Sequence, residues 1–152
     1  MMAPPRLAYR LAHLLRHRWR MFRKQPLAGA SMIARDLDGR ILMVRLSYTG
    51  DSWSLPGGGA KRGESFEAAA AREMLEETGC RAHAVRKLGE IAEVVSGSPH
   101  TAHVFACNVA ETPRPDGREV IEARLFPPHS LPHPRSALTD ARLALYRAQG
   151  GG

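Results

Sequence analysis

The stretch GGGAKRGESFEAAAAREMLEETGC, residues 57–80, decides the fold of this chain. Its first part is rich in glycine. Residues 65–78 are rich in Ala and Glu and contain neither Pro nor Gly, which predicts a helix. Gly79 suits the left-handed conformation that ends many helices. Three acidic residues stand close to that end: Glu73, Glu76 and Glu77.

These three glutamates occupy positions that helix electrostatics disfavours. Like charges at positions i and i+4 repel by about 0.2–0.5 kcal/mol per pair. Carboxylates in a last turn also face the negative end of the helix dipole, at a cost of about 0.3–1 kcal/mol each. On a helical wheel the three acids share about one third of the circumference. Residues on the other side predict the core face: Ala71, Met74, Leu75 and Thr78.

Two interpretations of this acidic face are open from its geometry. A solvated face usually alternates charge at i, i+4, but Arg72 is the only basic residue within residues 65–78. Several converging carboxylates instead predict a site for a hard cation such as Mg²⁺ or Mn²⁺. In such a site the repulsion among the acids becomes part of the binding free energy. Mg²⁺ also takes phosphate oxygens from a substrate, so a phosphorylated ligand is implied.

The composition predicts one globular domain with a basic appendage. The chain has 152 residues, is 43% hydrophobic and carries a net charge of +7. Residues 1–26 contain seven of the 22 Lys and Arg and no acid, so 15 basic and 15 acidic residues remain in residues 27–152. The neutral balance of that larger part argues against a domain built to bind nucleic acid through its charge.

The appendage, residues 1–26, shows helical periodicity over residues 5–24, with leucines on one face and most Arg and His residues on the other. Three roles are open: docking on an anionic membrane surface or RNA, packing against its own domain or a partner subunit such as a second copy in a homodimer, or disorder. Arg18 interrupts the apolar face and argues against deep membrane insertion. Its apolar runs are too short for a signal or transmembrane segment. The expected location is therefore cytoplasmic, with peripheral membrane attachment as an option.

The order of elements predicts an α/β domain over residues 27–149. Two apolar runs flank Asp38-Gly39, a strong hairpin signal. Cys80 and Cys107 are expected to be buried thiols rather than a disulfide. The remaining predicted elements are strands over residues 83–95, 101–110 and 119–126 and a helix over residues 136–148. This order favours a mixed sheet between helices.

The opening stretch resembles the Nudix box, G-x5-E-x7-R-E-U-x-E-E-x-G-U, where U is a bulky apolar residue. Gly58 and Glu64 fill the first two fixed positions, and residues 72–80, REMLEETGC, fill the rest, with Cys80 as the one soft match. The flanking segments SWSLPGG and EARLFPPHSLP also resemble the family, so the resemblance covers about residues 27–147.

The resemblance implies an α/β/α sandwich with the box as loop–helix–loop. It also implies hydrolysis of a nucleoside diphosphate linked to another moiety X, with Mg²⁺ or Mn²⁺. Carried over by position, Glu73, Glu76 and Glu77 hold the metal, and the Gly58 carbonyl is a further ligand. Glu73 or Glu77 is expected to orient or deprotonate the attacking water.

Other residues are expected to support this site. The resemblance makes Arg72 a partner that fixes the rotamers of the acids, with a helix-surface ion pair as the alternative, and it makes Glu64 another residue that supports the metal ligands without binding the metal. Many relatives recruit an acid from beyond the box. We favour Glu119 for that role and place Glu122 second. The alternative for Glu122 is that it is simply an exposed residue of its strand. Weaker candidates stand on the preceding strand: Glu90 and Glu93.

Substrate contacts are expected in the glycine-rich loop. Gly57 and Gly58 let backbone approach phosphate or metal. Trp53 either stacks on a nucleobase or packs in the core. A spacing of three places His100 and His103 on opposite faces of a strand, which argues against a transition-metal pair.

The substrate within the class is open between a nucleoside triphosphate and a nucleotide sugar. The proline that marks ADP-ribose members of the family is replaced by Val95 and Ser96. A second hypothesis is a nucleotide-binding or sensor module of the same fold without turnover. Such members commonly lose an acid of the box, and this chain keeps them all.

Overall fold

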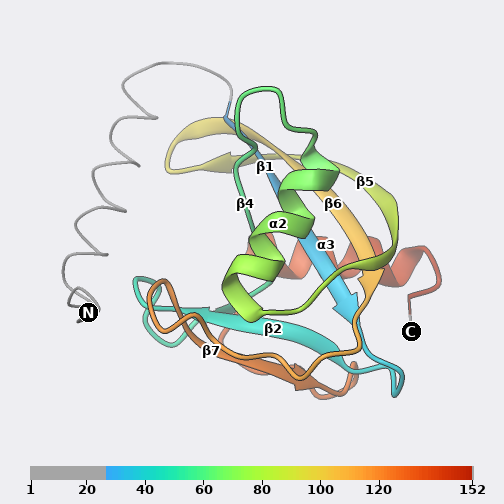
Figure 1. Cartoon of the computed structure of the whole chain (residues 1–152). Coiled ribbons are helices and arrows are strands. Elements are labelled where there is room, and N and C mark those ends of the chain that lie inside the picture. The colour runs from blue at the N-terminus through green and yellow to red at the C-terminus, as the bar shows by residue number, and fades with distance from the viewer. Residues whose placement is uncertain (1–26, 152) are drawn as a thin grey trace.

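A computed structural model of the chain describes residues 27–151, and the predicted basic helix lies outside the described residues. Seven strands and two helices follow one another along this part of the chain: β1 (Leu27–Arg35), β2 (Ile41–Leu46), β3 (Trp53–Ser54), β4 (Gly57–Gly58), α2 (Phe66–Thr78), β5 (His83–Val95), β6 (Ser98–Asn108), β7 (Val120–Phe126) and α3 (Ala137–Ala148). Figure 1 shows their arrangement.

The strands form one mixed sheet, as the order of elements predicts. Its main path runs β3-β2-β1-β6-β5, with β4 paired to β1 and β7 paired to β2. β1 and β6 are parallel over their length, from Leu27 opposite His100 to Arg35 opposite Asn108. The other strand pairs are antiparallel. Sequence periodicity does not reveal the parallel β1–β6 pair, because its partners are more than 70 residues apart in the chain.

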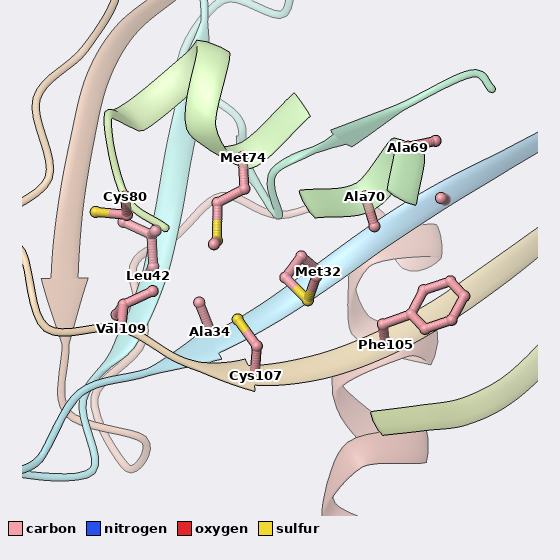
Figure 2. Close-up of a cluster of buried hydrophobic side chains, with 11 residues drawn as sticks. Met32, Ala34, Leu42, Ala69, Ala70, Met74, Cys80, Phe105, Cys107 and Val109 are labelled. Atoms are coloured by element: carbon pink, nitrogen blue, oxygen red, sulfur yellow. The ribbon is translucent and has the colours of Figure 1, made fainter. Parts of the chain in front are cut away.

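The two helices cover opposite faces of the sheet (Figure 1). Met74 of α2 is fully buried in one core cluster with Met32 and Phe105 (Figure 2). Leu143 of α3 is buried in a second cluster with Ile33. Alternate residues of β1 therefore point into different clusters, and the predicted α/β/α sandwich is confirmed.

Local signals set the ends of α2. The Ser65 side chain accepts a hydrogen bond from the Ala68 N–H at 3.1 Å, which caps the N-terminus. Gly79 has φ 74° and its N–H donates to the Leu75 carbonyl, so the left-handed stop predicted for this glycine is confirmed. The expected bounds of α2 and α3 differ from the observed ones by one residue.

Three expectations need correction. β6 spans Ser98–Asn108 rather than residues 101–110. The glycine-rich segment expected to be a loop contains the short strand β4, with β3 just before it. The core face of α2 includes Ala69 and Ala70, which are fully buried, whereas Leu75 is 44% exposed. These small alanines let the helix backbone approach the sheet closely, which turns Leu75 outward.

Both cysteines are free and buried, as expected. Burial raises the pKa of the Cys107 thiol to about 12. Within residues 27–151, none of the helices is long and apolar enough to cross a membrane.

Candidate active site

The glycine-rich loop reaches the acidic helix by pairing with the sheet. Gly58 of β4 lies opposite Ala30 of β1. A Cβ at Gly58 would come within 2.6 Å of the Glu73 carboxylate, and one at Gly57 would collide with the Ala30 carbonyl oxygen. Gly57 therefore requires glycine for lack of space, whereas a side chain at Gly58 would displace the Glu73 carboxylate, against which the backbone of β4 lies.

Arg72 ties the helix to this loop. Its Nε and Nη2 donate to the two Glu64 oxygens at 2.8 and 2.9 Å, a bidentate pair, and Nη2 also donates to the Gly59 carbonyl at 3.1 Å. Its Nη1 donates to Glu73 Oε1 at 3.1 Å and reaches Glu76 at 3.3 Å. The structure thus shows Arg72 paired with three acids and bonded to the backbone of the loop.

Glu64 holds Arg72 from the side of the loop, and we call the Arg72–Glu64 pair the clamp. Its Oε1 accepts the Lys61 N–H at 3.0 Å. The hydrogen bond from Arg72, followed by the Lys61 N–H, lowers the pKa of Glu64 to about 2. Glu64 therefore stays ionised and holds the Arg72 guanidinium in a fixed orientation.

Glu77 is buried, although the helical wheel places it with Glu73 and Glu76 on the side opposite the predicted core face. Only 6% of this residue is exposed, and its Oε2 has no hydrogen-bond partner within residues 27–151. Burial is the main cause that raises the pKa of Glu77 to about 9. Repulsion from Glu73 and Glu119 adds to it, and the Gly57 N–H opposes it. The predicted separation of a core face from a carboxylate face is therefore wrong for Glu77.

Glu73 and Glu76 are more exposed than Glu77. Their side chains are 19% and 55% exposed, respectively. Burial raises the pKa of Glu73, Arg72 opposes this shift, and Glu76 and Glu119 reinforce it. The three carboxylates therefore range from buried to solvated while lying on one stretch of helix.

The structure separates the two acids considered beyond the box. Glu119 acts electrostatically on both Glu73 and Glu77, which places it at the carboxylate cluster. Glu122 instead forms a short ion pair with Arg45 on β2. Glu119 therefore remains the candidate for a fourth acid, and Glu122 has a structural partner elsewhere.

Within the described part of the chain, no three His, Cys, Asp or Glu side chains already form a compact metal-ligand cluster. Glu73 and Glu76 are turned toward Arg72, and Glu77 is buried beneath them. The Glu73 carboxylate also lies against that of Glu77 and helps to raise its pKa.

Trp53 lies in the core rather than at the mouth of the site. It is 8% exposed, belongs to the cluster under α3 and meets Phe126 edge-on at 5.0 Å between ring centroids. Its position opposite Arg45 on β2 directs the ring to that side of the sheet. The expectation that Trp53 stacks on a nucleobase is therefore contradicted, and the core alternative holds.

The acids and histidines of β5 and β6 form networks that sequence reasoning missed. Glu93 accepts from Arg142 Nη2 at 2.6 Å and lies 2.8 Å from His100 Nδ1. Glu90 pairs with Lys87 at 2.8 Å. His103 stacks on Phe66 at 3.8 Å between ring centroids. The two histidines point to opposite faces, as expected, and neither Glu93 nor Glu90 belongs to the carboxylate cluster.

Comparison with known proteins identifies the family of this arrangement. The family model described as NUDIX domain matches residues 25–147. The crystal structure of a MutT NUDIX hydrolase from Burkholderia pseudomallei superposes with a TM-score of 0.71 at 26% identity, covering 80% of this chain and 98% of the other. The NUDIX domain of Shewanella oneidensis NrtR, complexed with ADP ribose, gives 0.73 at 16% identity over 82% and 88%, which shows the fold alone.

Curated relatives match over shorter stretches. A putative 8-oxo-dGTP diphosphatase of Bacillus subtilis is 44% identical over 61 residues, 40% of each protein. An RNA pyrophosphohydrolase of Sphingopyxis alaskensis is 43% identical over 56 residues, 36% of this chain and 34% of the relative. The matched stretches thus span less than half the length of these relatives.

Proposed function

The chain belongs to the NUDIX domain family, and from that premise we propose that it hydrolyses a phosphoanhydride bond in a nucleoside diphosphate linked to another moiety. The observation that carries this proposal is the buried Glu77 carboxylate, which lies beside two other acids and has one oxygen without a partner. Buried carboxylates are stable when paired with positive charge. The guanidinium nearest to this cluster, that of Arg72, is already engaged by Glu64, Glu73 and Glu76.

This environment fits a divalent cation, Mg²⁺ or Mn²⁺. The unpartnered Glu77 oxygen, Glu73 and Glu119 offer hard oxygen donors in a partly buried site, and Glu76 stands at its solvent edge. The Gly58 carbonyl is the proposed backbone ligand, since Gly58 directly adjoins Glu73. When bound, such a cation neutralises the negative charge that develops on the phosphate groups during hydrolysis.

The residues around the acids have positioning roles in this proposal. Arg72 and Glu64 hold the helix against the loop. Glu73 and Glu77 are the two candidates for the base that accepts a proton from the attacking water, because the pKa of each is raised. Gly57 and Gly58 are proposed to contact the substrate through their backbone, beside the Glu73 carboxylate.

The names of relatives narrow the substrate class. They include a putative 8-oxo-dGTP diphosphatase and two RNA pyrophosphohydrolases, alongside two diphosphoinositol polyphosphate phosphohydrolases, so names with a nucleotide or RNA substrate are the more numerous. We therefore rank nucleoside triphosphates first and nucleotide sugars second. The alternative of a binding or sensor module without turnover is less favoured, since the acids of the box are all present and grouped around one arginine.

The role of the basic segment and the cellular location of the protein are secondary parts of this proposal, and alternatives are open for both. Residues 5–24 are candidates for contact with an anionic membrane or RNA, or for packing in a homodimer. We propose a cytoplasmic location for the domain, with peripheral membrane attachment through that segment as the alternative.

A nucleotide panel tests the function. The full chain is incubated with Mg²⁺ and each nucleoside triphosphate, 8-oxo-dGTP, 5′-triphosphorylated RNA and several nucleotide sugars, and released phosphate and pyrophosphate are measured. We expect turnover on at least one of them that requires Mg²⁺ or Mn²⁺. Binding without turnover across the whole panel would favour the sensor module instead.

A further inference from the structure

A cavity lies beside α3, on the face of the sheet opposite the α2 carboxylates. Its volume is about 290 Å³. Arg35 follows Ile33 by two residues on β1, so it points to the same side as Ile33, which packs in the α3 cluster. Arg86 lies opposite Ala106, another member of that cluster, and Tyr146 belongs to α3 itself. The cavity therefore sits at the end of β1 and β6, away from the acidic site.

The lining of this cavity is positively charged. It includes the side chains of Arg35 and Arg86, and no Asp or Glu is among its described lining residues. Neither guanidinium forms a hydrogen bond or ion pair with another side chain within residues 27–151. Two unpaired guanidiniums around one enclosed space repel each other, and a ligand with two or more negative charges would relieve that repulsion.

Neutral donors complete the lining. Asn108 lies opposite Arg35 in the parallel β1–β6 register, so its amide stands next to the Arg35 guanidinium. Tyr146 is 6% exposed, and its ring is fixed in the core, with Gly151 packed against it. A phenol that is buried except at its edge on the cavity offers a rigid hydroxyl donor.

A β-bulge shapes this cavity. His83 lies opposite Asn108 and Arg86 opposite Ala106, so β5 carries one residue more than β6 over this interval. Ala84, within the bulge, has φ 52°, a left-handed conformation that is uncommon for a residue with a Cβ. Bulges redirect side chains and occur next to binding sites, and this one turns Arg86 into the cavity that Ala84 also lines.

We propose that this cavity binds a compact phosphate anion, with pyrophosphate the best fit. Its volume stands at the lower end of the range for small-molecule sites and accommodates one or two phosphate groups. Two arginines and two neutral donors match the several acceptor oxygens of such an anion. Because the sheet separates the cavity from the α2 carboxylates, its ligand does not compete directly with the substrate of the proposed reaction.

Isothermal titration calorimetry tests this site in the full chain. Pyrophosphate is titrated in metal-depleted buffer, where the carboxylates of the α2 site repel anions, and phosphate is titrated in a parallel arm. The test variant is Arg35→Gln/Arg86→Gln. The matched control is Arg118→Gln/Arg124→Gln, which removes the same charge from exposed arginines before and within β7. Both variants keep the basic N-terminal segment, so any nonspecific attraction of pyrophosphate to that segment is the same in the full chain and in both variants.

We expect pyrophosphate to bind the full chain and the control with similar affinity, and to bind the test variant at least tenfold more weakly. Tyr146→Phe keeps the packed ring and removes the hydroxyl, and we expect it to weaken binding about threefold to tenfold without moving the thermal midpoint. Equal weakening in test and control variants would mean that only net charge is sensed and would overturn the proposal. Absence of pyrophosphate binding to the full chain would overturn it as well.

Discussion

Glu77 and Glu93 are both buried carboxylates, and their partners differ. Glu77 belongs to α2, whereas Glu93 belongs to β5 and contacts Arg142 of α3. The Glu93 side chain is 4% exposed and contacts Arg142 at 2.6 Å and His100 at 2.8 Å. Glu77 is 6% exposed, and the acids Glu73 and Glu119 act on it. A buried charge with a cationic partner is a structural element, whereas a buried acid surrounded by acids stays protonated near neutral pH unless a cation binds beside it.

The largest expected effect concerns turnover. Glu77→Gln removes a charge but keeps the shape of the side chain, and we expect kcat to fall by about 10²-fold or more, the range seen when one charge-stabilising group is lost. Glu76→Gln should act in the same direction. Glu93→Gln, the matched change on the other face, should leave kcat of the folded protein within about threefold. Near-normal kcat in both α2 variants would mean that these acids do not form the catalytic site.

Mg²⁺ should stabilise the fold through one of these two glutamates and not the other. At a Mg²⁺ concentration about 100 times its Kd, linkage gives about 2.7 kcal/mol of added free energy of unfolding per site. Urea denaturation with and without Mg²⁺, at equal ionic strength, measures the gain. It should disappear in Glu77→Gln and persist in Glu93→Gln. The same gain in both variants would place the cation elsewhere.

Removing the charge of Glu93 should cost stability rather than activity. Glu93→Gln leaves the mostly buried Arg142 without its ionic partner, although Arg142 keeps the Leu138 carbonyl at 2.7 Å. We expect the free energy of unfolding to fall by about 2 kcal/mol, below the usual 3–5 kcal/mol for a broken buried pair, because that carbonyl remains. Denaturant unfolding at pH 7 checks this value. An unchanged midpoint would show that the pair contributes nothing to stability.

The smallest expected effect lies in the clamp between helix and loop. The pKa of Glu64 is lowered to about 2 in the folded chain. Its contribution to stability is therefore complete above its ordinary pKa near 4.5 and is lost as pH falls from there toward 2. We compare the pH dependence of unfolding in the full chain and in Glu64→Gln. The difference between them should shrink as pH falls through this window, and a constant difference would contradict the role of the ionised clamp.

Much of the fold could be predicted because its signals are local. Ser65 and Gly79 bound α2 through cap chemistry, and Asp38-Gly39 marks the turn between β1 and β2. The motif spacing likewise brought Arg72 together with Glu64. Such features depend on residues within a few turns of one another, so one sequence contains them.

The remaining features depend on which side of an element meets the sheet. A helical wheel gives the spacing of Glu73, Glu76 and Glu77 but not the direction of the sheet, so the burial of Glu77 could not be predicted. The sequence likewise does not show on which face of the sheet the Trp53 ring lies, because its partner Phe126 is 73 residues further along the chain. The pair formed by Glu93 and Arg142 spans 49 residues and has no sequence signature.

Direct binding of Mn²⁺ tests the central claim most plainly. Electron paramagnetic resonance of free Mn²⁺ counts the ions that the protein removes from solution, and it does so without substrate or turnover. We predict at least one tight Mn²⁺ site in the full chain, its loss or a large weakening in Glu77→Gln, and its retention in Glu93→Gln. Equal Mn²⁺ binding by the full chain and Glu77→Gln would contradict the assignment of this buried carboxylate as a metal ligand.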